Sequence, residues 1–334
     1  MTFADRVQAL AAHGFTERQA GFLLTVMLHG GICMERQYCA FARIRHGAKS
    51  EDFFAKLVAR RFASVHRAAH GRARLFHVHH RALYEAIGEP HNRHRKAAAL
   101  PRAIERLMLL DAVLASREMT WLATERDKLA YFAPLVHGKL QREHLPHLRF
   151  GNGTGTTIRY FPDKLPIGLD GDGREHVFTY LITRSAPVDF RQFLHRHAEL
   201  LGALPRWTIR LLVPPHLQNA VAAYEVAWRD EFASPLRPAV LDELRWYFEE
   251  RRRLEQAAGL TTDDHELRFR RADDAFAAPR YRVLYRMWLE QGESALASLT
   301  SPVLADAIAR GNGQIDRQVL AHQYLHLSPL VTTA

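Results

Sequence analysis

Residues 15–88 constrain this chain most, because they carry two hydrophobic periods in a fixed order. Apolar side chains first recur every three or four positions in three successive segments, which predicts three amphipathic helices. The first helix opens at Thr16, where a Thr and a Gln three residues apart form a capping box. The second spans about Met34 to Ile44, and the third follows Ser50, its predicted N-cap. The pattern then changes to two short strands around a turn.

Most of the excess positive charge also lies in this stretch or beside it. Residues 1–100 hold 16 Lys and Arg against 7 Asp and Glu, whereas the rest of the chain holds 30 against 29. Ten of the 20 histidines fall in the same first segment. An asymmetry of this size predicts a polyanionic partner for the first hundred residues. The alternative is a basic, solvated surface without a partner.

Three helices followed by a basic hairpin are typical of a winged helix-turn-helix. The segments FTERQAGFLLTVMLHGGICMERQYCAFARI, KSEDFFAKLVARRFASV and RARLFHVHHRALYEAIG resemble the amino-terminal winged helix of replication-relaxation-type proteins of plasmids and integrating elements. This resemblance covers about the first quarter of the chain well and the rest only loosely. It implies a role in plasmid or mobile-element replication, transfer or transcription regulation. Arg61 stands where many winged helices have a glycine, which costs about 1 kcal/mol or more if the position needs a positive φ.

The third predicted helix would enter the major groove of double-stranded DNA, and the wing would hold the phosphate backbone. The residues expected nearest the DNA are Lys49, Ser50, Lys56 and Arg60 from the helix and Arg67, Arg72 and Arg74 from the wing. Gly47 is expected to take a positive φ in the turn before this helix.

The histidines and cysteines of this segment invite a metal site. His77 and His79 would share one face of a strand, which suits two ligands of a zinc ion. A third ligand at useful spacing is missing, so we interpret these histidines as donors to phosphate and expect no metal ion or cofactor. Cys33 and Cys39 are expected to be small buried residues in a reducing cytosol.

At 334 residues the chain is long enough for two or three domains. We expect an α+β fold with a winged helix at 1–88, a basic linker at 89–101, a small α/β domain at 102–235 and a helical C-terminal region at 236–334. The linker could contact phosphates or serve only as a hinge. The C-terminal parts would mediate homodimerisation or bind other proteins. Without an apolar run of roughly 18 residues or a signal-peptide pattern, we expect a cytoplasmic protein that does not contact a membrane.

Catalytic chemistry has one candidate, the Pro-Asp pair at Pro162 and Asp163. Restriction-type nucleases use such a pair with an (Asp/Glu)-x-Lys on the next strand to hold Mg²⁺ and position the attacking water. The predicted next strand, Val177 to Thr183, contains neither an acid nor a lysine. We therefore expect no enzyme, and interpret the domain as a degenerate restriction-endonuclease-like core or a coincidental α/β hairpin. The alternative is a metal-dependent DNA nuclease that the winged helix delivers and that depends on Asp163.

Overall fold

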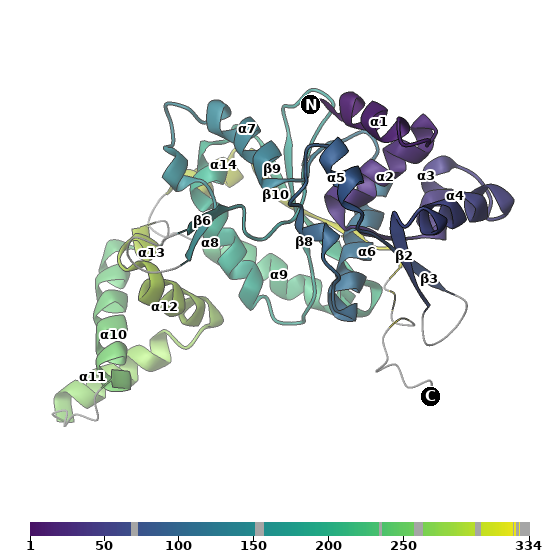
Figure 1. The fold of residues 1–334 in the computed structure, drawn as a ribbon. Coiled ribbons are helices and arrows are strands. Elements are labelled where there is room, and N and C mark those ends of the chain that lie inside the picture. The colour runs from purple at the N-terminus through teal and green to yellow at the C-terminus, as the bar shows by residue number, and fades with distance from the viewer. Residues whose placement is uncertain are drawn as a thin grey trace.

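The chain folds as an α+β protein built around two separate sheets and a small hairpin. The computed structural model describes residues 1–67, 73–150, 157–233, 236–256, 263–297 and 302–322, together with Tyr324 and Leu327. Figure 1 shows a group of N-terminal helices with its own sheet, a central sheet flanked by helices, and a helical arm that extends away from that sheet. Each helix among the described residues is too short or too polar to span a bilayer.

The N-terminal module comprises residues 3–86. Its elements are α1 (Phe3–Ala11), α2 (Glu17–His29), β1 (Ile32–Met34), α3 (Glu35–Ala42), α4 (Ala48–Ala59), β2 (Ala63–Arg67), β3 (Arg74–Val78) and α5 (Arg81–Ala86). The three strands form an antiparallel sheet in the order β1-β3-β2. The predicted capping box at Thr16 is confirmed, because its hydroxyl accepts from the Gln19 N–H and the Gln19 side chain accepts from the Thr16 N–H.

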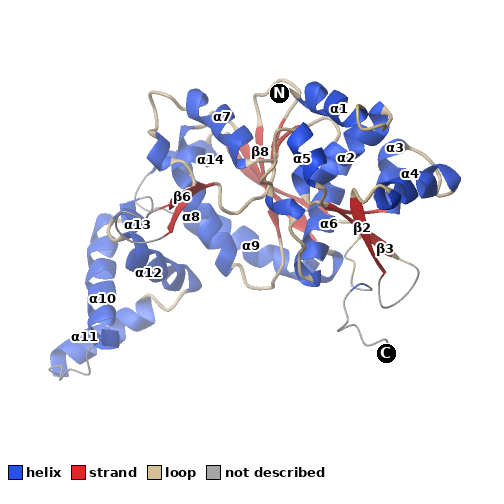
Figure 2. Cartoon of the chain, viewed as in Figure 1, coloured by secondary structure: helices blue, strands red, loops and turns tan. Residues whose placement is uncertain are grey.

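The central sheet has five strands in the order β10-β9-β8-β7-β4. Strands β8, β9 and β10 are parallel, and β7 is antiparallel to both β8 and β4. Figure 2 shows these strands at the centre of the molecule between helices. The elements of this region are α6 (Leu100–Ala115), β4 (Thr120–Leu122), α7 (Glu125–Leu135), β5 (His147–Phe150), β6 (Thr157–Tyr160), β7 (Ile167–Leu169), β8 (His176–Leu181), α8 (Val188–Ala203), β9 (Trp207–Val213) and α9 (Val221–Trp228).

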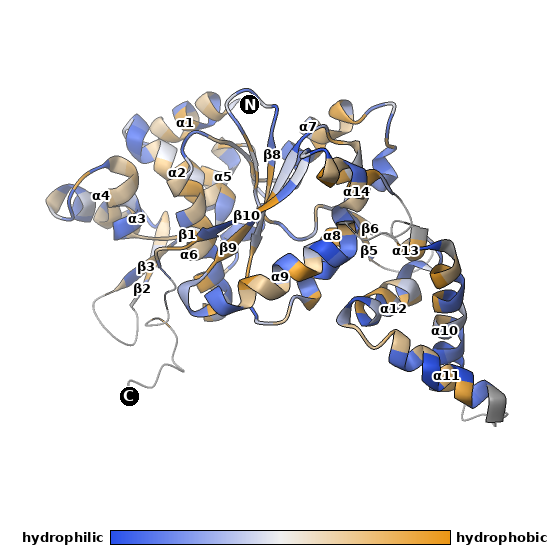
Figure 3. Cartoon of the chain, turned by 180° about the vertical axis from the view of Figure 1, so that it is seen from behind, coloured by the Kyte–Doolittle hydropathy of each residue, from blue (hydrophilic) through white to orange (hydrophobic). Residues whose placement is uncertain are grey.

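The C-terminal region is predicted to be helical, but it also contributes a strand, β10, to the central sheet. Its elements are α10 (Pro238–Gln256), α11 (Asp263–Ala275), α12 (Pro279–Gln291), α13 (Ser294–Ala297), α14 (Pro302–Ala309) and β10 (Gly313–Val319). Strand β10 can pair closely with β9 because Gly313 lies over Trp207, where an added Cβ would come within 2.3 Å of the indole. The arm formed by α10 and α11 is coloured largely hydrophilic in Figure 3.

The predicted linker at 89–101 is instead packed over part of its length, at Asn92 to Arg95, whereas Lys96 and Ala97 are exposed and Leu100 begins α6. A 3-10 turn at Arg93–Arg95 buries His94, whose carbonyl oxygen accepts a hydrogen bond from Nε2 of His77 at 2.9 Å. The same carbonyl oxygen lies 2.5 Å from where a Cβ on Gly31 would stand. Only a glycine therefore allows this close approach, and the segment cannot act as a hinge in this arrangement.

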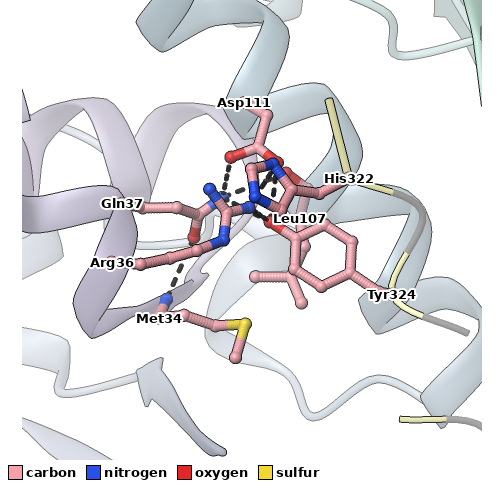
Figure 4. A network of polar contacts seen from close by, with 7 residues as sticks. All are labelled: Met34, Arg36, Gln37, Leu107, Asp111, His322 and Tyr324. Carbon is pink, nitrogen blue, oxygen red and sulfur yellow. Dashed lines mark hydrogen bonds and ion pairs between the residues drawn. The ribbon is translucent and has the colours of Figure 1, made fainter. Parts of the chain in front are cut away.

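Helix α6 fixes the N-terminal module to the rest of the protein. Its Leu110 belongs to the core of the module, whereas Leu107 packs with Leu181 and Leu212 of the central sheet. A polar network at the same junction joins α3, α6 and the segment after β10 (Figure 4). Its side chains are those of Arg36, Gln37, Asp111, His322 and Tyr324.

Asp111 is the centre of this network. Its carboxylate accepts from Arg36 at 2.5 Å, from the Gln37 amide at 2.8 Å and from the Tyr324 hydroxyl at 2.7 Å. Burial raises the pKa of Tyr324, and the neighbouring Asp111 carboxylate adds to that rise. The phenol therefore stays protonated and can donate at any physiological pH.

Candidate nucleic-acid interface

The core of the N-terminal module holds α4 by its aromatic face. Phe53 and Phe54 are buried, as their helical spacing predicts, and the Phe53 ring lies 4.4 Å from that of Tyr38. Phe54 lies 4.2 Å from Phe76 of β3, so α3, α4 and the sheet share one aromatic cluster. Because these rings fix the inner face of α4, its opposite face is presented to solvent.

The turn between α3 and α4 carries exposed cations. Arg43, Arg45 and Lys49 are exposed, and none of them pairs with a carboxylate of another described residue. The left-handed conformation of this turn is taken by Arg43, with φ of 53°, and not by Gly47 as predicted. Gly47 is extended, with φ of 160°. Arg43 and Arg45 are not among the predicted contact residues, because only the third predicted helix and the hairpin were expected to lie nearest the DNA.

Ser50 is not available for contact with a ligand in this structure. Its side chain is completely buried, and its hydroxyl both donates to the carbonyl oxygen of Gly47 and accepts from the Gly47 N–H. Gly47 is the N-cap of α4, which places Ser50 in the first turn of the helix. The predicted N-cap at Ser50 is therefore wrong by three residues, and Ser50 leaves the set of candidate contact residues.

Lys56 and Arg60 are exposed but tie α4 to the loop between α1 and α2. Nζ of Lys56 donates to the carbonyl oxygen of Gly14, and a guanidinium N–H of Arg60 donates to that of His13. The Arg60 guanidinium also lies 4.5 Å from the centroid of the Phe62 ring. Each cation keeps further N–H donors beyond these bonds. Both side chains can therefore also hold an anion without giving up their contact with the loop.

On the β2–β3 hairpin, Arg74 is exposed and forms an ion pair with Glu35 at the start of α3. Glu35 also accepts from Nε2 of His46 at 2.5 Å, so one carboxylate holds the hairpin and the α3–α4 turn together. The backbone of Arg67 pairs with that of Arg74 in the hairpin. Arg72 and the side chain of Arg67 lie outside the described residues.

His77 and His79 do lie on one side of β3, with ring centroids 5.6 Å apart. Burial lowers the pKa of both imidazoles. The described residues contain no group of three His, Cys, Asp or Glu side chains that could hold a metal ion. Cys33 and Cys39 are buried free thiols, as predicted, and burial raises the pKa of Cys33.

Asp163, the residue on which a nuclease site would depend, lies before β7 on the loop from β6. It forms an ion pair with Arg196 of α8, and its other oxygen lies 4.0 Å from Nδ1 of His197. Burial lowers the pKa of His197 to about 4. On the neighbouring strand β8, the Thr179 hydroxyl donates to the carbonyl oxygen of Pro166 at 2.6 Å. The carboxylate is thus engaged by a cation of the protein itself.

No family model, curated protein or solved structure matches this chain.

Proposed function

We propose that the N-terminal module is a winged helix-turn-helix that binds double-stranded DNA. The observation that carries this proposal is a group of exposed cations before and at the start of α4, Arg43, Arg45 and Lys49, which no carboxylate among the described residues pairs with. The element order supports the fold, because a helix, a strand, two helices and a hairpin are combined with a β1-β3-β2 sheet. In such a fold α3 and α4 are the helix-turn-helix, and β2 and β3 are the wing.

Helix α4 would lie in the major groove with phosphate contacts at both of its ends. Lys49 and the α3–α4 turn stand at its N-terminus, while Lys56 stands in its last turn and Arg60 is its C-cap. The exposed Glu51 and Asp52 lie between these two groups of cations. Repulsion between their carboxylates and phosphates would keep the middle of α4 away from the strands and over the base edges.

Arg74, with Arg67 and Arg72, would contact the backbone beside the groove. By the family resemblance, the setting would be replication, transfer or transcription regulation of a plasmid or another mobile element. A homodimer would be recognised by selection of palindromic fragments from a random duplex library.

The test compares the triple variant R43Q/R45Q/K49Q with a charge-matched control, R174Q/R271Q/R310Q, whose exposed arginines lie outside the module. Fluorescence anisotropy with a labelled duplex measures affinity at several salt concentrations. Each lost phosphate or base contact is expected to cost roughly 1–3 kcal/mol. The slope of log affinity against log salt should fall by about 0.9 for each phosphate contact removed.

Equal loss of affinity in the two triple variants would refute a specific role for this surface and indicate nonspecific attraction to a basic protein. Weak, salt-independent binding by the unmodified protein would favour a module that contacts only proteins.

The nuclease alternative has one structural observation in its favour, the position of Asp163 directly ahead of the β7–β8 hairpin. The ion pair with Arg196 opposes it, because a divalent cation would have to compete with that guanidinium for the carboxylate. Incubation with plasmid and Mg²⁺ or Mn²⁺ separates the two functions. Cleavage that Asp163→Ala abolishes would establish the nuclease.

A further inference from the structure

A second positively charged site lies away from the proposed DNA-contacting face. It is a pocket of about 680 Å³ between the end of α2, residues 89–94, the start of α7 and the β5–β6 hairpin. Four basic side chains line it, those of Arg93, Lys128, Arg159 and Lys164, and we name it the cation pocket. Its volume lies within the range of pockets that bind small molecules and cofactors.

The four cations of the pocket have no ion-pair partner among the described residues. Two carboxylates also line the pocket, but each is engaged elsewhere. Glu125 accepts a hydrogen bond from the backbone N–H of Tyr160 at 2.9 Å. Glu89 forms an ion pair with Arg126 at 3.1 Å. The lining of the pocket thus holds four cations and two carboxylates, which leaves an excess of positive charge among the described residues.

Lys128 is the most informative member, because its side chain is almost completely buried. Its ammonium donates to the carbonyl oxygen of Leu165 at 2.6 Å and lies 5.5 Å from the Phe161 ring centroid. Burial, followed by repulsion from Arg93, lowers the pKa of Lys128 to about 7. A buried ammonium without a carboxylate partner destabilises a fold. A bound anion would remove this cost.

The same repulsion acts on the other cations. Burial, together with Arg102 and Arg106, lowers the pKa of Arg93 to about 9. Burial lowers the pKa of Lys164, and Arg93 contributes to this effect. The backbone at the rim is strained as well, since Phe161 and Lys164 are non-glycine residues with φ of 47° and 61°. Strain of this kind concentrates at ligand sites.

An aromatic side chain stands beside the cations. Phe150 of β5 lines the pocket and is 52% exposed, and the strand register places it on the same face of the β5–β6 hairpin as Arg159. An exposed aromatic ring next to cations is the combination that binds a nucleobase together with its phosphate.

We propose that the cation pocket binds a phosphate-bearing nucleotide, with its phosphates on Arg93, Lys128 and Lys164 and its base against Phe150. The phosphate can belong to a free nucleotide or to the 5′ end of a nucleic-acid strand, and the two sources share this chemistry. The proposal is independent of DNA binding by α4.

Isothermal titration calorimetry on the full chain tests it, with ATP, a 5′-phosphorylated tetrathymidylate and its 5′-hydroxyl counterpart as ligands. Lys128→Met removes the buried charge, and Lys164→Gln removes an exposed one. Each is expected to weaken binding by about tenfold or more, as loss of a charge-assisted phosphate contact does. Arg174→Gln, an exposed cation outside the pocket, should leave the affinity within about twofold.

Binding of ATP identifies a free nucleotide as the source, and binding of only the 5′-phosphorylated strand identifies a strand end. Circular dichroism confirms that Lys128→Met is folded, and Lys164→Gln gives an independent reading at an exposed position. The proposal is overturned if none of the phosphorylated ligands binds, or if Arg174→Gln weakens binding as much as the two pocket variants do.

Discussion

Two arginines in the N-terminal module adopt backbone conformations that favour glycine. Arg43 ends α3 with φ of 53°, and Arg61 follows α4 with φ of 56°. At Arg61 the backbone N–H donates to the carbonyl oxygen of Val58, which closes the helix. The residue must be left-handed here so that the chain can turn into β2. Arg61 therefore has the positive φ that is expected to cost an arginine about 1 kcal/mol or more in stability.

Replacing Arg61 by glycine is expected to stabilise the protein by about 1 kcal/mol, because glycine takes a positive φ without steric cost. The midpoint of urea denaturation measures the change. Ala59→Gly, two residues earlier within α4, is the control and should destabilise by about 0.5–1 kcal/mol. A loss of stability in Arg61→Gly would show that the arginine side chain contributes more than its backbone strain costs.

Lys128 makes the stability of the fold depend on pH. Its folded-state pKa of about 7 lies below the ordinary value of 10.5, so the folded protein binds fewer protons than the unfolded chain between these values. Stability should therefore rise with pH across this window, and the full penalty applies below pH 7. Lys128→Met should stabilise the protein at pH 6 by at least about 1 kcal/mol, and this gain should shrink towards pH 10.

Urea denaturation of both proteins at pH 6 and pH 9.5 measures this difference. A gain that is equal at both pH values would mean that the methionine acts through packing alone.

The network around Asp111 connects two helices, α3 and α6, with the segment that follows β10 (Figure 4). Asp111→Ala would leave the buried Gln37 amide and the Tyr324 hydroxyl without this acceptor. We expect a destabilisation of about 2–4 kcal/mol, because unsatisfied buried polar groups are costly.

Glu105→Ala on the same helix is the matched control. Glu105 pairs with Arg102 in an i,i+3 pair whose arginine is half exposed, so its removal should cost less than about 0.5 kcal/mol. Thermal denaturation of the two variants side by side tests whether the network contributes more to stability than an ordinary surface ion pair does.

The helices of the N-terminal module could be predicted because their apolar spacing and the capping box at Thr16 are local signals. Strand β10 could not be predicted, since its sequence from Gly313 to Val319 is mostly polar. Its strand state comes from pairing with the buried β9, a tertiary contact that overrides local preference. The three-residue strand β1 was missed because it is too short to show a period.

At the candidate interface, too, the sequence predicts local properties but not tertiary contacts. The excess of Lys and Arg over Asp and Glu indicates the basic segment, and the exposure of Lys49 and Arg74 agrees with their predicted placement on the surface. The number of charged residues does not predict that Ser50 is buried or that Glu35 pairs with Arg74, because the burial and the ion pair depend on how the helices pack.

The division of the chain into domains differs most from the prediction at the segment 89–101. Its composition is that of a basic linker, but Gly31 and His77 provide a surface on which His94 packs. The same segment supplies Arg93 to the cation pocket. A charge run with the composition of a spacer is thus packed in part, with His94 buried and Arg93 and Arg95 half-buried, and this packing depends on the fold around it.

The connectivity of the two sheets also has a kinetic consequence. Arg210 of β9 pairs with Asp316 of β10, 106 residues later, and the Gln37 amide meets the Tyr324 hydroxyl across 287 residues. Contacts between such distant positions slow folding, because long loops must close before these contacts form. The helices near the amino terminus should therefore gain protection from hydrogen exchange early during refolding, and the edge between β9 and β10 should gain it last.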